Sequence, residues 1–285
     1  MPLRMRIGDR RTDLADLALV HSSERRAQTP YWSTFFNTCD SDCPRSHLIN
    51  PNNANTVDTN NLIQVIEYSI FRKTTDSFDV LQCAKIDAAL SSARYYQRNM
   101  LRSKNFSNDL DHLAFSLENT CINGLYLEFG VASGRTINHI AGLKSGQTIY
   151  GFDVFTGLPE TWRTGFESGA FGRAALPPVR ENCKLISGLF ENTLPPFIEG
   201  KSRDIAFIHV DCDLYAGTRT ILETCRPYLK AGTVICFDEY FNYPGYEQHE
   251  FLAWREFYNK YGIAYEYLGF VSSHQQVSIR ITAIA

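Results

Sequence analysis

The chain has 285 residues, of which 44% are hydrophobic and 21% are charged, and its formal net charge is -3. These values are ordinary for a globular protein with a buried core, and they give no electrostatic reason to expect nucleic-acid binding. No apolar run approaches the ~18–20 residues of a membrane span, and residues 14–20 are too short for a signal-peptide core. We therefore expect a cytoplasmic protein that binds neither nucleic acid nor a membrane.

Eight cysteines do not change this expectation. Most of them lie in apolar stretches, where thiols usually pack as small hydrophobic side chains. Cys39 and Cys43 lie in a polar stretch and could bind a metal or form a disulfide, yet no second CxxC motif or nearby histidine pair completes a zinc set. We interpret them as a free or incidental pair.

The first 120 residues fall into two segments. Residues 1–60 are polar and have the composition of loop, so this segment is either poorly ordered or folded over another part of the protein. Apolar spacing then predicts helices over residues 61–71, 79–100 and 110–121. We expect residues 61–120 to be a helical extension, which either covers an active site as a lid or forms a dimer interface. A homo-oligomer is therefore left open.

Residues 121–285 have a different pattern, in which short apolar runs alternate with helical stretches. The runs that predict buried strands are residues 125–131, 148–154, 183–189, 205–212 and 232–240. Such alternation indicates an α/β fold with a mostly parallel sheet covered by helices on both faces. The last two predicted strands, 264–271 and 275–282, are separated by a short turn and should pair as an antiparallel hairpin. A Rossmann-like sheet that ends in such a hairpin is typical of a class I methyltransferase domain.

A long loop interrupts this alternation at residues 155–182, which are rich in glycine, proline and aromatic residues. Long loops inside compact domains are commonly lids or binding loops. We expect a lid or binding loop, with an inert insertion as the alternative.

The first predicted strand ends in a glycine turn, in which Gly130 and Gly134 are spaced G-x-x-x-G. A tight glycine turn at the carboxyl end of this strand lets a ligand approach the backbone closely. The spacing is not the G-x-G-x-x-G that cradles a pyrophosphate, which argues against a nicotinamide dehydrogenase. S-adenosylmethionine has no pyrophosphate and fits this turn. A packing role for the glycines is the alternative when the turn is taken alone.

Two further features strengthen the prediction of an S-adenosylmethionine site. Asp153 ends the second strand, 19 positions after Gly134, and an acidic residue about 20 positions on is placed to bind ribose hydroxyls. The third strand is followed by residues placed where adenine would lie, although Phe190 could equally belong to the core. The predicted cofactor-binding residues are Glu128, Gly130, Ser133, Gly134, Asp153, Ser187, Gly188 and Phe190.

Four carboxylates follow the next two strands. Strand alternation places Asp211 and Asp213 on the same side, and Asp238 and Glu239 lie at the tip of the adjacent strand. This concentration of negative charge would be repulsive without a cation, and oxygen-only ligands favour Mg²⁺ over zinc. The alternative is that Asp211 caps the next helix and Glu239 is solvated.

Four segments of this region resemble the macrocin O-methyltransferase family of class I methyltransferases: EFGVASGRT, GFDVFTGLPE, HVDCDLYAGT and FDEYFNYPGYEQHEF. The resemblance covers roughly residues 124–285, and the last two segments are its most specific parts. It implies that S-adenosylmethionine and Mg²⁺ are used to methylate a hydroxyl of a sugar, often within a glycosylated metabolite.

Carried over by motif, the implied metal ligands are Asp211, Asp238 and Glu239, and Asp213 is the implied general base. The family often has Asp where this chain has Glu239, which keeps the charge but reaches further. Mg²⁺ would acidify the acceptor hydroxyl, and Asp213 would take its proton. Positioning would then supply most of the rate of methyl transfer.

Other side chains near these motifs have two interpretations. The residues that follow the metal motif either shape an acceptor pocket or pack the loop against a helix: Tyr240, Phe241, Tyr243, Tyr246 and His249. We interpret His209 and His139 as structural.

Two other functions compete with sugar O-methylation. One is metal-dependent O-methylation of a catechol-like phenol, which needs the same cofactor and ion. The other is a non-catalytic assembly protein that binds S-adenosylmethionine, which would be expected to have lost some of the four carboxylates. The sequence does not identify the acceptor or the hydroxyl that is methylated.

Overall fold

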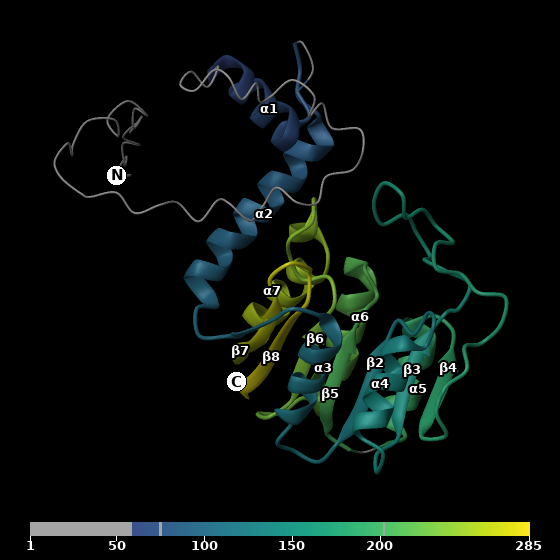
Figure 1. Ribbon diagram of the computed structural model, residues 1–285. Coiled ribbons are helices and arrows are strands. Elements are labelled where there is room, and N and C mark those ends of the chain that lie inside the picture. The colour runs from purple at the N-terminus through teal and green to yellow at the C-terminus, as the bar shows by residue number, and fades with distance from the viewer. Residues whose placement is uncertain (1–58, 74–75, 202) are drawn as a thin grey trace, which may run out of the picture. The chain divides into compact units, whose positions relative to one another are not determined.

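The computed structural model describes residues 59–73, 76–201 and 203–285 (Figure 1). The expectations for the polar N-terminal segment up to residue 58, and for Cys39 and Cys43, lie outside the described residues. Residues Thr59–Ala285 form one unit by their internal contacts.

In the described residues, eight strands form one sheet in the order β1-β7-β8-β6-β5-β2-β3-β4. Strand β8 runs antiparallel to β6 and β7, and the other neighbouring pairs are parallel. The predicted class I methyltransferase sheet, mostly parallel with a C-terminal antiparallel hairpin, is thereby confirmed. The strands are β1 (Lys104–Phe106), β2 (Leu125–Phe129), β3 (Ile149–Asp153), β4 (Cys183–Ser187), β5 (Ile205–Val210), β6 (Val234–Phe237), β7 (Ala264–Val271) and β8 (Val277–Ala283).

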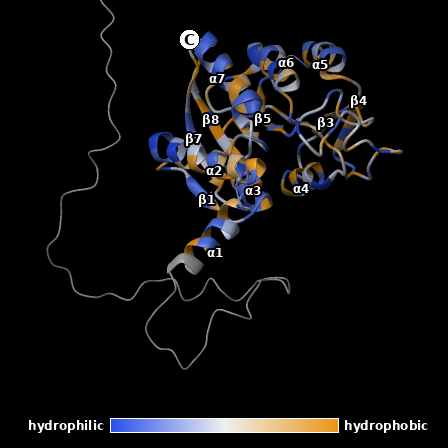
Figure 2. Ribbon diagram, turned by 90° about the horizontal axis from the view of Figure 1, so that it is seen from above, coloured by the Kyte–Doolittle hydropathy of each residue, from blue (hydrophilic) through white to orange (hydrophobic). Residues whose placement is uncertain are grey.

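Helices cover both faces of the sheet (Figure 2). Helices α3 (Asp109–Glu118) and α4 (Arg135–Leu143) contact each other on one face, and α5 (Phe190–Glu199), α6 (Tyr215–Cys225) and α7 (Glu250–Tyr261) form a contacting row on the other. The central strands β2, β5 and β6 are buried along their whole length, because apolar side chains alternate between two hydrophobic clusters. Burial on both faces explains why these strands are almost continuously apolar.

Helices α1 (Thr59–Phe71) and α2 (Val80–Asn99) precede the sheet, as the apolar spacing predicted. The C-terminal half of α2 contacts the loop after β6, since the Ser92 hydroxyl accepts a hydrogen bond from the Asn242 amide at 2.9 Å. The expected division at residue 120 stays a prediction. Strand β1 and helix α3 lie before it, yet β1 pairs with β7 and α3 packs on the sheet.

Among the described helices, none is both long enough and apolar enough to cross a membrane.

Candidate active site

The glycine turn between β2 and α4 lies directly against the tip of β5. Gly130 has φ +91°, and a Cβ atom on it would lie 1.6 Å from the carbonyl oxygen of Asp211. The Asp211 amide donates to the carbonyl of Phe129 at 2.8 Å, which ties the two strand ends together. Only glycine permits this close backbone approach at positive φ. The turn therefore fixes the position of the Asp211 backbone.

Asp153 at the end of β3 holds the same turn from its other side. One carboxylate oxygen accepts hydrogen bonds from the amides of Val131 and Ala132 at 2.9 and 2.8 Å, and the other accepts from the Phe155 amide at 2.6 Å. Asp153 also lines the neighbouring cavity. A carboxylate has about four acceptor positions, so these three bonds leave capacity for a ligand hydroxyl.

A cavity of about 590 Å³ opens at this edge of the sheet. The predicted cofactor residues that line it are Gly130, Asp153, Gly188 and Phe190, and the predicted acidic residues that line it are Asp211, Asp213 and Glu239. The structure thus brings the cofactor and metal halves of the predicted site to one cavity. The predicted residues that do not line it are Glu128, Ser133, Gly134, Ser187 and Asp238.

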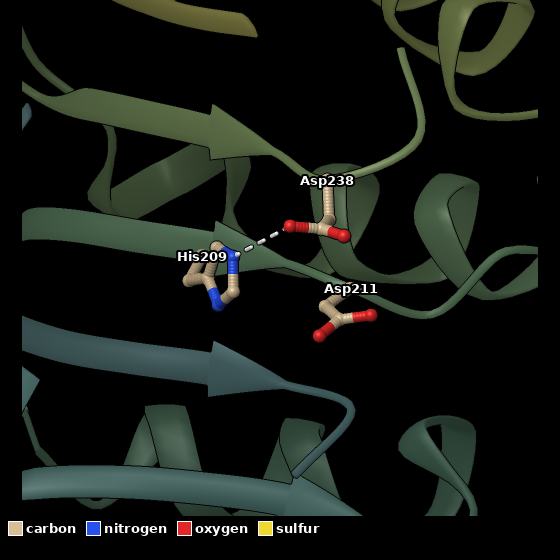
Figure 3. Close-up of side chains that lie close together, drawn as sticks. All are labelled: His209, Asp211 and Asp238. Carbon is tan, nitrogen blue, oxygen red and sulfur yellow. Dashed lines mark ion pairs between the residues drawn. The ribbon is translucent and has the colours of Figure 1, made fainter. Parts of the chain in front are cut away.

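The acidic residues at the tips of β5 and β6 form two overlapping clusters. Ligand atoms of Asp211, Asp213 and Glu239 all lie within 4.8 Å of one another, and the same limit holds for His209, Asp211 and Asp238. Asp211 and Asp238 follow the ends of adjacent strands (Figure 3). Asp213 has φ +65°, an unusual left-handed conformation for a residue other than glycine. Such conformations persist where the surrounding structure enforces them, often at functional sites.

Burial and mutual repulsion dominate the electrostatics of the cluster. Burial, followed by the charge of Asp238, raises the pKa of Asp211 and of Glu239 well above their usual values. The same causes raise the pKa of Asp213 to about 7, against the opposing charge of Arg163. Burial also acts on Asp238, but contact with His209 outweighs it and holds the pKa of this carboxyl low.

These residues fit a divalent cation. The donors of the cluster that lines the cavity are all carboxylate oxygens, which suit a hard ion such as Mg²⁺. The Glu239 Oε2 atom is buried and has no hydrogen-bond partner among the described residues. A buried carboxylate oxygen without a partner is costly, and a bound cation would satisfy it.

Two buried residues lie beneath the cluster, and sequence reasoning did not single out the first of them, Glu250. Glu250, in the first turn of α7, accepts a hydrogen bond from the Glu239 amide at 3.0 Å. An acidic residue in a first helical turn is common, so the sequence carries no distinguishing signal. His209, interpreted as structural, is buried between Glu128 and Asp238, with contacts of 3.4 and 3.7 Å.

The loop at residues 155–182 supplies an aromatic and cationic wall of the cavity through Trp162, Arg163 and Phe166. The Arg163 guanidinium lies 3.9 Å from the centre of the Trp162 ring and 4.8 Å from that of Tyr243. The aromatic residues that follow the metal motif are buried but do not line the cavity: Tyr240, Phe241, Tyr243 and Tyr246. Of the two interpretations, packing describes these four, and His249 packs against Trp162 and Tyr243.

Residues 127–240 match a protein family described as a methyltransferase domain. The match runs from β2 through the glycine turn to the residues just after β6, so it includes both acidic strand tips. With the sheet order, it confirms the predicted class of enzyme, an S-adenosylmethionine-dependent methyltransferase. No curated protein sequence matches the chain.

Several solved structures are similar to the chain. The calicheamicin methyltransferase CalS11 is 25% identical over 60% of this chain and 76% of its own, with a TM-score of 0.48. The O-methyltransferase NovP is 20% identical over 61% and 79%, with a TM-score of 0.47. The mycinamycin-pathway methyltransferase MycE, solved with Mg and SAH, is 13% identical over 72% and 63%, with a TM-score of 0.39.

Proposed function

We propose that the protein transfers the methyl group of S-adenosylmethionine to a hydroxyl of a sugar or glycosylated metabolite, with the help of Mg²⁺. The observation that carries this proposal is the acidic cluster of Asp211, Asp213 and Glu239, which lines the same cavity as the glycine turn. A methyl donor and an ion that activates a hydroxyl would therefore meet in one space.

The cofactor half of the proposed site combines backbone and side chain. Gly130 allows close approach, and the free acceptor positions of Asp153 suit ribose hydroxyls. Gly188 and Phe190 supply the wall where adenine would lie. Ser133 and Gly134 belong to the turn itself and support it rather than line the cavity.

In the metal half, Asp211, Asp238 and Glu239 would hold the ion. When bound, Mg²⁺ supplies Lewis acidity toward an acceptor hydroxyl. Asp213 is buried beside these residues and lines the cavity, so its carboxylate is placed to accept the hydroxyl proton. Glu250 fixes the backbone of Glu239 through its hydrogen bond to the Glu239 amide.

The sugar as acceptor rests on the macrocin O-methyltransferase-like segments, above all FDEYFNYPGYEQHEF, and on the wall of the cavity. Trp162 and Phe166 line the cavity with aromatic rings suited to a carbohydrate ring, and Arg163, whose guanidinium lies over both rings, adds hydrogen-bond donors. A phenolic acceptor would use the aromatic faces but has fewer hydroxyls for these donors.

An acceptor screen tests the proposal. The protein would be incubated with S-adenosylmethionine, Mg²⁺ and panels of nucleotide sugars, glycosylated metabolites and catechols, and methyl uptake would be followed by mass spectrometry. We expect methylation of a sugar hydroxyl. Methylation of catechols alone would replace the sugar with the phenolic alternative. Binding of S-adenosylmethionine with no transfer to any panel would favour the non-catalytic alternative.

A further inference from the structure

A row of buried polar side chains crosses three adjacent strands beneath the acidic cluster. Glu128 on β2 lies in register with His209 on β5. His209 in turn is in register with Cys236 on β6, so Asp238 follows two residues later on the same side of that strand. Glu128 and His209 are almost fully inaccessible, and neither lines the cavity.

These side chains approach one another in a row that ends at Asp238, in which the two approaches to the His209 ring are ion-pair contacts and not hydrogen bonds. The Thr136 hydroxyl donates to Glu128 Oε1 at 2.9 Å, and Glu128 Oε2 lies 3.4 Å from His209 Nδ1. On the far side of the ring, Nε2 lies 3.7 Å from Asp238 Oδ1 (Figure 3). The same Asp238 oxygen accepts a hydrogen bond from the side-chain Nε2 of Gln276 at 3.1 Å. One carboxylate oxygen of Asp238 is thus hydrogen-bonded by Gln276 and approached by His209.

A packing role alone does not explain this arrangement. Both ring nitrogens of His209 face carboxylates from different strands: Glu128, which is fully buried, and Asp238, whose side chain is 15% exposed. Burying the Glu128 carboxylate is costly unless its contacts are used. Groups that hold and orient a ligand residue commonly tune metal sites, and losing one typically weakens metal affinity roughly 10–100-fold.

We propose that His209, which faces the carboxylate of Glu128 that Thr136 hydrogen-bonds, is a positioning residue that orients Asp238 toward the divalent ion. Glu128 then acts on the metal site and not on the cofactor, in line with its absence from the cavity wall. This inference rests on the metal site of the proposed function.

Binding of Mn²⁺ to the full-length, chelator-treated protein tests it, with free Mn²⁺ measured by electron paramagnetic resonance. Mn²⁺ takes the same oxygen ligands as Mg²⁺. In H209L, which removes both ring nitrogens, we expect the affinity to fall roughly 10–100-fold while S-adenosylmethionine affinity is unchanged. H209Q keeps an N–H donor directed at Asp238 and should recover part of the loss. E128Q by itself should weaken Mn²⁺ binding, and adding E128Q to H209L should cause little further loss of affinity.

H139Q is the matched control, because His139 is a half-buried histidine on α4 whose Nε2 atom lies 3.1 Å from the Leu110 carbonyl oxygen. It should bind Mn²⁺ like the wild type. If H209L does not fold, T136V carries the test, since it removes only the hydroxyl at the far end of the row and should still weaken Mn²⁺ binding.

Three results would overturn the inference, and they are distinguishable. Unchanged Mn²⁺ affinity in the folded His209 and Glu128 variants would contradict the positioning role alone. A loss of S-adenosylmethionine affinity in E128Q, with Mn²⁺ binding intact, would show that Glu128 binds the cofactor, as the sequence predicted. A directly coordinated nitrogen in the pulsed spectrum of bound Mn²⁺ would make His209 a ligand. Failure of the wild type to bind Mn²⁺ would instead remove the metal site, and with it the proposed mechanism.

Discussion

Asp213 combines a left-handed backbone, burial and a place on the cavity wall. Asparagine adopts the left-handed region more readily than most residues, so D213N should keep the backbone and remove only the proton-accepting charge. We expect kcat to fall by roughly 10²–10⁴, with affinity for S-adenosylmethionine unchanged. Single-turnover rates and calorimetry with S-adenosylhomocysteine would measure the two effects separately. A near wild-type rate in D213N would show that a group other than Asp213 accepts the proton of the acceptor hydroxyl.

Gly130 lies where the cofactor turn meets the metal strand, and no side chain fits there. In G130A the new Cβ would need the space of the Asp211 carbonyl and would sit at φ +91°. We expect the free energy of unfolding to drop by about 1–3 kcal/mol and the affinity for S-adenosylmethionine to fall with it. G146A is the control, because a Cβ there meets nothing within 4 Å. Equal free energies of unfolding for G130A and G146A would show that the turn accommodates a Cβ atom at position 130 without loss of stability.

At the scale of elements, His112 joins helix α3 to the sheet. Its Nε2 atom lies 2.8 Å from the Ser278 hydroxyl of β8, and burial lowers its pKa to about 4. Its pKa in the unfolded chain is about 6.5, so the unfolded state binds more protons between these values. Stability should therefore fall as the pH drops from about 6.5 to 4, by about 3 kcal/mol in total.

Urea unfolding of the wild type and H112N across this pH range measures that contribution. The variant should lose much of the pH dependence, because asparagine keeps a polar partner for Ser278 without a titrating ring. Parallel pH profiles for the two proteins would mean that other groups control the acid sensitivity.

Much of the fold was predictable because its elements follow simple local patterns. The buried parallel strands are continuous apolar runs, and the hairpin of β7 and β8 follows from the short turn between them. Strand β1 was not predicted, because the polar tripeptide Lys104–Phe106 has no strand pattern and is defined only by its pairing with β7.

The candidate site was likewise predictable in part. Asp211, Asp213 and Glu239 come together because neighbouring parallel strands end at one edge of the sheet. The contact between Glu128 and His209 could not be read from the sequence, because it depends on the register of two strands separated by about 80 residues. The absence of Glu128 from the cavity wall likewise could not be read from the sequence.

At the scale of the whole molecule, the glycine turn and the acidic residues at the tips of β5 and β6 are linked by direct contacts. Asp153 holds the turn, the turn packs on the Asp211 backbone, and Glu250 holds the Glu239 backbone from below. The loop at residues 155–182 contributes Trp162 and Arg163 to the wall of the cavity beside them. This coupling predicts that the carboxylates are pre-positioned before an ion or acceptor arrives.

The central claim is that methyl transfer depends on a divalent ion held by the strand-tip carboxylates. The direct measurement is methyl transfer from labelled S-adenosylmethionine to the acceptor found in the screen, with EDTA and then with added Mg²⁺, alongside cofactor binding in each condition. We expect EDTA to abolish transfer while cofactor binding remains, Mg²⁺ to restore it, and D211A to be inactive in both. Transfer that persists in D211A after the metal is removed would contradict the claim.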